Sequence, residues 1–214
     1  MDFRECLDQL SNGAAPGPDG IPAVMLKRAK NTISIMLANI FKSSYEKGDI
    51  PAILKLAHIT PIRKGGSRSN PANFRPISLT SHVIKTFERV MRRSLVGFLE
   101  TNKKMDPNQH GSRSGRSTLS QLLMQQDAVL KALEEGENLD TIYLDFAKAF
   151  DKCDHGILLT KLKALGIGGK TGRWIFSFLS GRIQKVIVKG RKSQGSVLKS
   201  GVPQGSVLGP ILFF

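Results

Sequence analysis

The chain has 214 residues, 40% of them hydrophobic, so it is long enough and apolar enough to bury the core of one domain or of two small ones. Its 32 Lys and Arg residues against 17 Asp and Glu give a formal net charge of +15 and a pI near 10.1, which indicates a polyanionic partner, with nucleic acid the first candidate. The basic residues are spread among apolar segments instead of forming one amphipathic helix, and no apolar run reaches the ~18 residues that span a bilayer, so a membrane-bound protein is disfavoured.

The cysteines indicate a reducing environment and no zinc site. Cys6 and Cys153 stand far apart and lack the paired spacing of zinc ligands. Cys153 precedes Asp154 and His155, but no second ligand pair accompanies this triplet, and Asp154 is better placed to cap a helix. The N-terminus also lacks the charged and apolar regions of a signal peptide. We therefore expect a soluble, intracellular protein, in either the nucleus or the cytoplasm.

The N-terminal part predicts a loop followed by helices. Residues 11–20 are rich in Gly and Pro and indicate a loop, after which Pro22 opens a helix. A second helix is predicted to end at Gly48 and Pro51. Its apolar residues at helical spacing are Ile33, Met36, Leu37, Ile40, Phe41 and Tyr45.

A basic hairpin and a long helix come next. Leu56 to Arg63 predicts a strand, and residues 64–70 predict a turn that returns the chain through Phe74 and Ile77. Residues 81–100 then predict an amphipathic helix. Its apolar face consists of Val83, Ile84, Phe87, Met91, Leu95 and Phe98.

The middle of the chain predicts a helix and then a strand. Thr118 and Gln121 have the spacing of a capping box, which opens a helix through Leu130. In residues 141–146, apolar side chains alternate with Tyr143 and Asp145, as in a strand with one buried face.

The C-terminal part predicts two short helices and a hairpin. The helices are expected to end at Gly166 and near Gly181. Residues 183–189 and 196–199 predict a β-hairpin around Gly190 and Arg191, and the last residues begin a further helix. This mixture of helices with a hairpin sheet predicts an α+β fold.

Asp145 is the first candidate functional residue. An aspartate is disfavoured inside a strand unless something uses it, and hard cations such as Mg²⁺ bind carboxylate oxygens. The alternative is a structural aspartate that caps the following turn. The strand pattern by itself leaves both open.

Several motifs together resemble one family, the reverse transcriptase domain of non-LTR, LINE-like retrotransposons. The resemblance extends from about Gly17 to the end of the chain. In chain order the matching segments are Gly17-Pro-Asp-Gly-Ile-Pro22, Ile59-Thr-Pro-Ile-Arg-Lys64, Asn73-Phe-Arg-Pro-Ile-Ser78, Gln109-His-Gly111 with Gly115-Arg-Ser-Thr118, Leu144-Asp-Phe-Ala-Lys-Ala-Phe-Asp151 and Gly201-Val-Pro-Gln-Gly205.

The resemblance implies a fold, a reaction and its partners. It implies the right-hand polymerase architecture, with an N-terminal extension and fingers over residues 1–138, a partial palm over residues 139–214, and no thumb. The implied function is RNA-directed DNA polymerase, which uses an RNA template, a DNA primer and deoxynucleoside triphosphates. Two Mg²⁺ ions would serve the intact enzyme, one lowering the pKa of the primer hydroxyl and the other stabilising the leaving pyrophosphate. Asp145 and the Phe146 carbonyl match family metal ligands, and Asp145 is thereby the implied catalytic residue.

The resemblance also implies a nucleotide site. Lys64 and Arg75 match the fingers residues that bind the triphosphate, and Arg63 is their neighbour. The alternative is a hairpin whose basic side chains are simply solvated. Gln204 and Gly205 match a turn where the backbone approaches the nucleotide and template.

Two residues near Asp145 have roles that remain open. Phe150 matches the ring that excludes a ribose 2′-hydroxyl, so deoxynucleotides would be selected; the alternative is a core phenylalanine. Asp151 matches a residue common in the family but also suits a helix-proximal cap.

The chain departs from the family pattern at two places. Ser112 stands where the family usually has an aromatic residue, and the aromatic-Ala-Asp-Asp motif that supplies the other metal-binding aspartates should lie beyond Phe214. The chain alone is therefore expected to be inactive. Alternatives are a non-catalytic nucleic-acid-binding remnant, or a reverse transcriptase or maturase of the group II intron type. The oligomeric state is not predicted.

Overall fold

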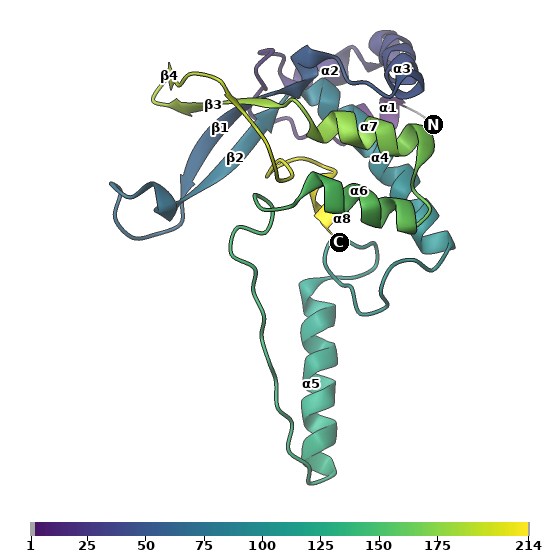
Figure 1. Cartoon of the computed structure of the whole chain (residues 1–214), viewed down its shortest axis with the longest axis vertical. Coiled ribbons are helices and arrows are strands. Elements are labelled where there is room, and N and C mark those ends of the chain that lie inside the picture. The colour runs from purple at the N-terminus through teal and green to yellow at the C-terminus, as the bar shows by residue number, and fades with distance from the viewer. Residues whose placement is uncertain (1–2, 214) are drawn as a thin grey trace. The chain divides into compact units, whose positions relative to one another are not determined.

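The computed structural model describes residues 3–213 and divides into two compact units (Figure 1). Unit 1 comprises Met1–Val96 with Ala149–Phe214, and unit 2 comprises Gly97–Lys148. Helices and strands are mixed, as the predicted α+β class requires. In the described part of the chain, no helix combines the length and apolar character needed to cross a membrane.

Unit 1 contains one five-stranded sheet, in which β2, β1, β3 and β4 are neighbours in that order and β5 pairs with β3. The strands are β1 (Leu56–Arg63), β2 (Phe74–Thr80), β3 (Ile183–Val188), β4 (Arg191–Lys192) and β5 (Ser196–Val197). The predicted basic hairpin is confirmed, since β1 and β2 pair antiparallel from Ala57↔Thr80 to Arg63↔Phe74. The predicted C-terminal hairpin is confirmed in β3, β4 and β5. In addition, β3 pairs parallel with β1, starting at Leu56↔Ile183.

Helices form where the apolar spacing predicted them, but parts of the predicted apolar faces are exposed, among them Met36, Ile40 and Phe98. They are α1 (Phe3–Asp8), α2 (Ala23–Arg28), α3 (Lys30–Lys47), α4 (His82–Thr101), α5 (Thr118–Glu134), α6 (His155–Ala164), α7 (Gly169–Leu179) and α8 (Gly209–Phe213), with short 3-10 turns at Ala52–Lys55 and Pro71–Asn73. Helix α3 ends as predicted at Gly48, which adopts the left-handed conformation with φ 68°. Asp154 caps α6 as predicted, since its Oδ1 accepts a hydrogen bond from the Ile157 N–H at 2.9 Å.

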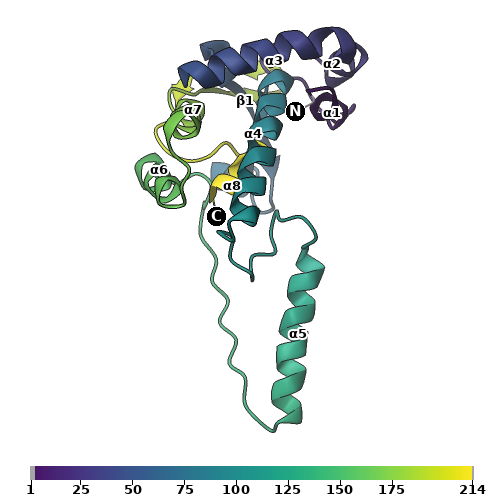
Figure 2. The same ribbon diagram turned by 90° about the vertical axis from the view of Figure 1, so that its right-hand side faces the viewer.

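An aromatic cluster forms the centre of unit 1. The Phe41 ring of α3 lies 5.7 Å from Phe3, 5.3 Å from Phe87 and 5.9 Å from Trp174, measured between ring centroids. The indole N–H of Trp174 donates to Ser44 Oγ at 3.0 Å, so this buried polar atom is satisfied. The cluster thereby joins α1, α3, α4 and α7, and Figure 1 shows the β1–β2 hairpin projecting away from these helices. Figure 2 shows α3 lying above α4 and α7.

In unit 2, helix α5 begins one residue earlier than the capping box expected from Thr118 and Gln121. Ser117 is the N-cap, because its extended backbone (φ −153°, ψ 170°) lets its side chain accept from the Ser120 N–H, and Ser120 Oγ in turn accepts from the Ser117 N–H. The box with Thr118 and Gln121 is therefore wrong. Buried His110 holds the loop before the helix, with Nδ1 2.7 Å from Ser120 Oγ.

The strand predicted over residues 141–146 is not formed. The segment has no regular secondary structure, and Ile142, Leu144 and Phe146 are all more than 70% exposed. A strand needs a neighbour for its backbone N–H and C=O groups, and none of the described strands pairs with this segment. The prediction of a strand with one buried face is therefore wrong for these residues.

Candidate nucleotide-binding site

Lys64 and Arg75 lie on the same hairpin with free cationic side chains. Arg75 is exposed on β2 opposite Ile62, and Lys64 begins the loop, where its backbone N–H donates to the Asn73 carbonyl at 2.8 Å. Neither side chain has a hydrogen-bond or ion-pair partner among the described residues. Arg63 differs, because its Nη2 donates to the Gly66 carbonyl at 2.6 Å and helps to close the loop. Lys64 and Arg75 thus remain available to an anionic ligand, as does the exposed Arg68 in the loop between them.

The turn that contains Gln204 and Gly205 is attached to the edge of β2. The Ser78 N–H donates to the Gln204 carbonyl at 2.7 Å. Gly205 has φ +106°, and a Cβ at this position would lie 3.0 Å from the Ser78 carbonyl oxygen, so a larger residue is strained here. Gly205 also approaches Ile77, which lies two residues along β2 from Arg75. The turn with Gln204 and Gly205 therefore contacts β2 at Ile77 and Ser78, two and three residues along the strand from Arg75.

Glu88 of α4 holds the other side of this turn. The side chain is completely buried, and its Oε2 accepts hydrogen bonds from the backbone N–H groups of Val207 at 2.6 Å and Leu208 at 3.0 Å. These two groups directly precede α8, where backbone N–H groups lack partners within the helix. A carboxylate at this place also suits the positive end of the helix. Glu88 therefore fixes where the turn after Gly205 enters α8.

The electrostatics around Glu88 reflect its burial. Desolvation raises the pKa of Glu88, while hydrogen bonds from Leu208 and Val207 and the charges of Arg182 and Lys85 lower it. Arg182 is also buried, at 1% exposed; it donates to the Phe178 carbonyl at 3.1 Å, and its guanidinium lies 5.0 Å from the centre of the Phe178 ring. Burial lowers the pKa of Arg182, against the opposite effect of Glu88.

Phe150 is held against the same region of unit 1. Its ring stacks on Phe213 at 5.3 Å between centroids, and its carbonyl accepts from the Val202 N–H at 2.8 Å. The carbonyls of Phe150 and Asp151 also lie against Gly201, where an added Cβ would meet them at 2.7 and 2.8 Å. The backbone of Gly201 and Val202 therefore packs directly against the backbone of Phe150 and Asp151.

The candidate metal ligands Asp145 and Phe146 lie in unit 2, in the exposed segment after α5. Within residues 3–213, no group of three or more His, Cys, Asp and Glu residues could hold a metal ion. A carboxylate and a carbonyl oxygen suit Mg²⁺ chemically but supply only part of a two-ion ligand set. Asp151 is exposed, and the part of it that forms a described contact is its carbonyl, which accepts from Ser200 Oγ at 3.2 Å.

Sequence reasoning missed Glu88 and Ser78. Glu88 lies four residues after Ile84, on the apolar face of the helix, where a carboxylate is unusual unless it has partners. That position was a usable signal for a buried structural role. Ser78 gave no signal, because it acts through its backbone N–H.

Comparison with known proteins identifies the family. The family described as reverse transcriptase (RNA-dependent DNA polymerase) matches residues 62–214, which include every residue of the candidate site. The chain belongs to the reverse transcriptase family.

Similar proteins are RNA-directed DNA polymerases of non-LTR retrotransposons. The chain is 34% identical to the RNA-directed DNA polymerase from mobile element jockey of Drosophila melanogaster. It is 32% and 31% identical to the probable polymerases from transposons X-element and BS of the same species. Each match covers 99% of this chain and 23% of the relative, so the chain spans about a quarter of the length of these relatives.

The resemblance to the non-LTR reverse transcriptase domain is thus confirmed, and with it the enzyme class of the family. The mixed helix and strand content agrees with a polymerase fingers and palm fold. The family uses divalent metal ions and acts on a nucleic-acid template with nucleotide substrates.

Proposed function

We propose that this reverse transcriptase segment binds the incoming deoxynucleoside triphosphate and the RNA template during DNA synthesis by a LINE-like element. The observation that carries the proposal is that the Gln204–Gly205 turn contacts Ile77 and Ser78 of β2, the strand that carries the exposed Arg75. A planar guanidinium binds two phosphate oxygens at once, and Lys64 adds a point charge from the same hairpin. Gly205 leaves the backbone open to close approach.

In this proposal, residues 1–138 form the fingers with an N-terminal extension and residues 139–214 form part of the palm, without a thumb. Asp145 and the Phe146 carbonyl supply oxygen ligands for Mg²⁺, which would activate the primer hydroxyl and stabilise the pyrophosphate. The remaining carboxylates come from parts of the polymerase outside this segment. The chain alone is therefore expected to extend no primer. We place the activity of the whole polymerase inside the cell.

The nucleotide site can be tested in a chimera in which this chain replaces the matching segment of the jockey polymerase. Arg75→Ala should raise the KM for deoxynucleoside triphosphates at least about tenfold, since a charge-assisted hydrogen bond is worth roughly 1.5–3 kcal/mol. Lys64→Ala should raise KM less. Lys161→Ala, which removes an exposed lysine of α6, serves as the control and should leave KM unchanged. Equal KM values for Arg75→Ala and Lys161→Ala would refute the site.

A nucleic-acid-binding remnant without catalysis is the second candidate. The observation in its favour is that the described residues contain no cluster of three metal-binding side chains. The chain with its charge of +15 should then still bind RNA with an affinity that falls as salt rises. The chimera separates the two candidates, because Asp145→Ala abolishes primer extension only if the segment contributes to catalysis.

A further inference from the structure

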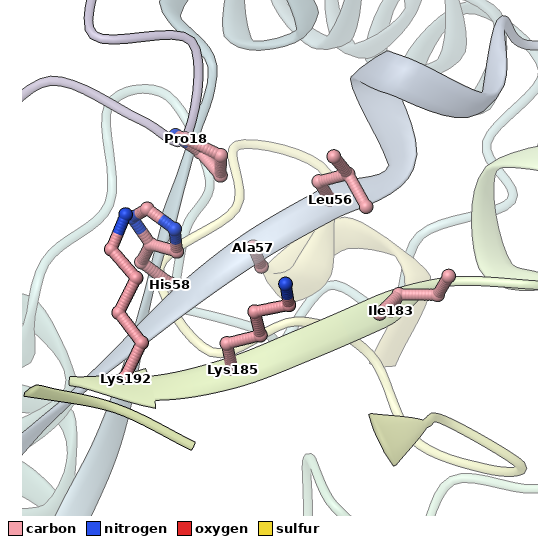
Figure 3. A pocket seen from close by; sticks show the side chains of 7 residues that line it. All are labelled: Pro18, Leu56, Ala57, His58, Ile183, Lys185 and Lys192. Atoms are coloured by element: carbon pink, nitrogen blue, oxygen red, sulfur yellow. The ribbon is translucent and has the colours of Figure 1, made fainter. Parts of the chain in front are cut away.

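One face of the sheet in unit 1 carries a basic cavity that the nucleotide site does not use. The cavity has a volume of about 220 Å³ and is lined by Pro18, Leu56, Ala57, His58, Ile183, Lys185 and Lys192. Figure 3 shows His58 beside Lys192, with Lys185 extending from the neighbouring strand on the same side of the sheet. The basic groups come from β1, β3 and β4, so only the assembled sheet creates this cavity.

The three basic side chains lack neutralising partners. No described carboxylate lies within ion-pair distance of Lys185 or Lys192, and none lines the cavity. Asp19, next to Pro18 in sequence, is engaged elsewhere, because it accepts hydrogen bonds from Ser81 Oγ at 2.6 Å and from the Ile21 N–H at 3.3 Å. A cavity that gathers unpaired cations is suited to an anion, which would offset their mutual repulsion.

The pKa of His58 depends on its burial and on the two lysines beside it. Burial lowers the pKa of His58, and the charges of Lys192 and Lys185 lower it further. These lysines are the charged groups that face His58 from β4 and β3. An anion held between the three side chains would act in the opposite direction and favour the imidazolium.

The cavity lies on the same face of the sheet as Arg75. Residues paired across strands share a face, and His58 pairs with Lys185 of β3 and with Leu79 of β2, while Arg75 pairs with Ile62. Ile62 and His58 are four residues apart on β1, which corresponds to about 13 Å along the strand. The opposite face carries buried Ile59 and packs on the core.

We infer that this cavity binds a backbone phosphate of the single-stranded RNA template, beside the position where a nucleotide would bind at Arg75. The inference rests on the proposed function. A template strand that is being read is unpaired ahead of the incoming nucleotide, so its phosphates are accessible one by one. His58, Lys185 and Lys192 provide N–H donors for one phosphodiester, and Leu56 and Ile183 provide an apolar floor for the sugar or base.

The first test measures binding of the 214-residue chain to a uridine decamer by fluorescence anisotropy over a range of salt concentrations. Each phosphate contact to a single strand contributes about 0.7 to the slope of log K against log salt. Loss of this one phosphate contact in K185Q/K192Q should therefore reduce the slope by about 0.7, which corresponds to about a fivefold change in affinity for each tenfold change in salt. The matched control is K161Q/K163Q, two exposed lysines of α6, which should leave the slope unchanged because these lysines lie away from the cavity and distant charges are screened.

Two outcomes of this test are distinct failures. If both double variants bind with the same affinity and slope as the unmodified chain, the cavity does not contact the strand, while RNA binding by the chain stands. If the unmodified chain binds no RNA, both the proposed function and the cavity assignment are wrong.

The second test needs no substitution and follows the imidazole signals of His58 by NMR during a pH titration. Addition of the decamer should raise the pKa of His58, because the phosphate stabilises the protonated ring. Deoxythymidine triphosphate at the same phosphate concentration distinguishes the two sources of phosphate. A pKa of His58 that does not respond to the decamer, or that responds as strongly to the free triphosphate, would overturn the template assignment.

Discussion

Removal of the Glu88 carboxylate should lower the free energy of unfolding of unit 1 by more than a surface substitution does. In Glu88→Ala, the part-buried N–H of Val207 and the buried N–H of Leu208 lose their acceptor, at about 1–3 kcal/mol each. Buried Arg182 also loses a neighbouring negative charge, although no hydrogen bond joins its guanidinium to Glu88, so this loss costs less than the roughly 3–5 kcal/mol of breaking a direct buried pair. These costs overlap, and they are partly offset because the variant no longer has to bury a carboxylate. We therefore expect the free energy of unfolding to fall by about 3–5 kcal/mol.

The assay is urea unfolding followed by tryptophan fluorescence. Trp174 is the only tryptophan of the chain and is fully buried in unit 1, so its signal reports the unit that contains Glu88. Glu88→Gln keeps an oxygen that can accept from both N–H groups but removes the charge, and should cost only about 1–3 kcal/mol. The difference between the two variants separates the hydrogen bonds from the charge.

Glu134→Ala provides the control, because Glu134 is an exposed carboxylate in the last turn of α5. A surface substitution of this kind should change the free energy of unfolding by no more than about 0.5 kcal/mol. If Glu88→Ala unfolds at the same urea concentration as Glu134→Ala, the hydrogen bonds to Val207 and Leu208 do not hold the turn, and the positioning role of Glu88 is refuted.

Further variants test the remaining contacts of unit 1. Gly201→Ala should lower the free energy of unfolding by more than about 2 kcal/mol, since φ is +86° and the added Cβ would lie 2.7 Å from the Phe150 carbonyl. Gly13→Ala is the control and should be neutral, because an added Cβ there meets no atom within 4 Å. Equal urea midpoints for Gly201→Ala and Gly13→Ala would refute this packing. In the jockey chimera, Phe150→Ala should reduce discrimination against ribonucleotides at least about tenfold in kcat/KM if the ring blocks the 2′-hydroxyl. A variant that is destabilised but keeps its sugar selection would instead show that the stack on Phe213 makes Phe150 a core residue. Burial and the charge of Lys85 lower the pKa of His82, so the imidazole of the folded chain binds a proton less readily than that of the unfolded chain. The free energy of unfolding should therefore fall as the pH drops below 6.5, the ordinary pKa of histidine. His82→Gln should flatten that part of the curve of stability against pH, and identical curves for the two proteins would contradict the shift.

Much of this protein was determined by the sequence alone. The boundaries of β1, the left-handed end of α3 at Gly48 and the Asp154 cap follow from local patterns, because each depends on a few neighbouring residues. The reverse transcriptase family was also visible in short motifs. The nucleotide-binding roles of Lys64 and Arg75 stay predictions until the chimera is measured.

Tertiary structure decided the features that depend on distant residues. Residues 141–146 alternate like a strand but do not become one, since pairing needs a partner that the pattern cannot specify. The contact of Glu88 with Val207 joins residues 119 positions apart, and the parallel pairing of β1 with β3 places Lys185 beside His58. Local sequence fixes which side chains an element carries, but only the folded chain fixes which elements share an edge or a face.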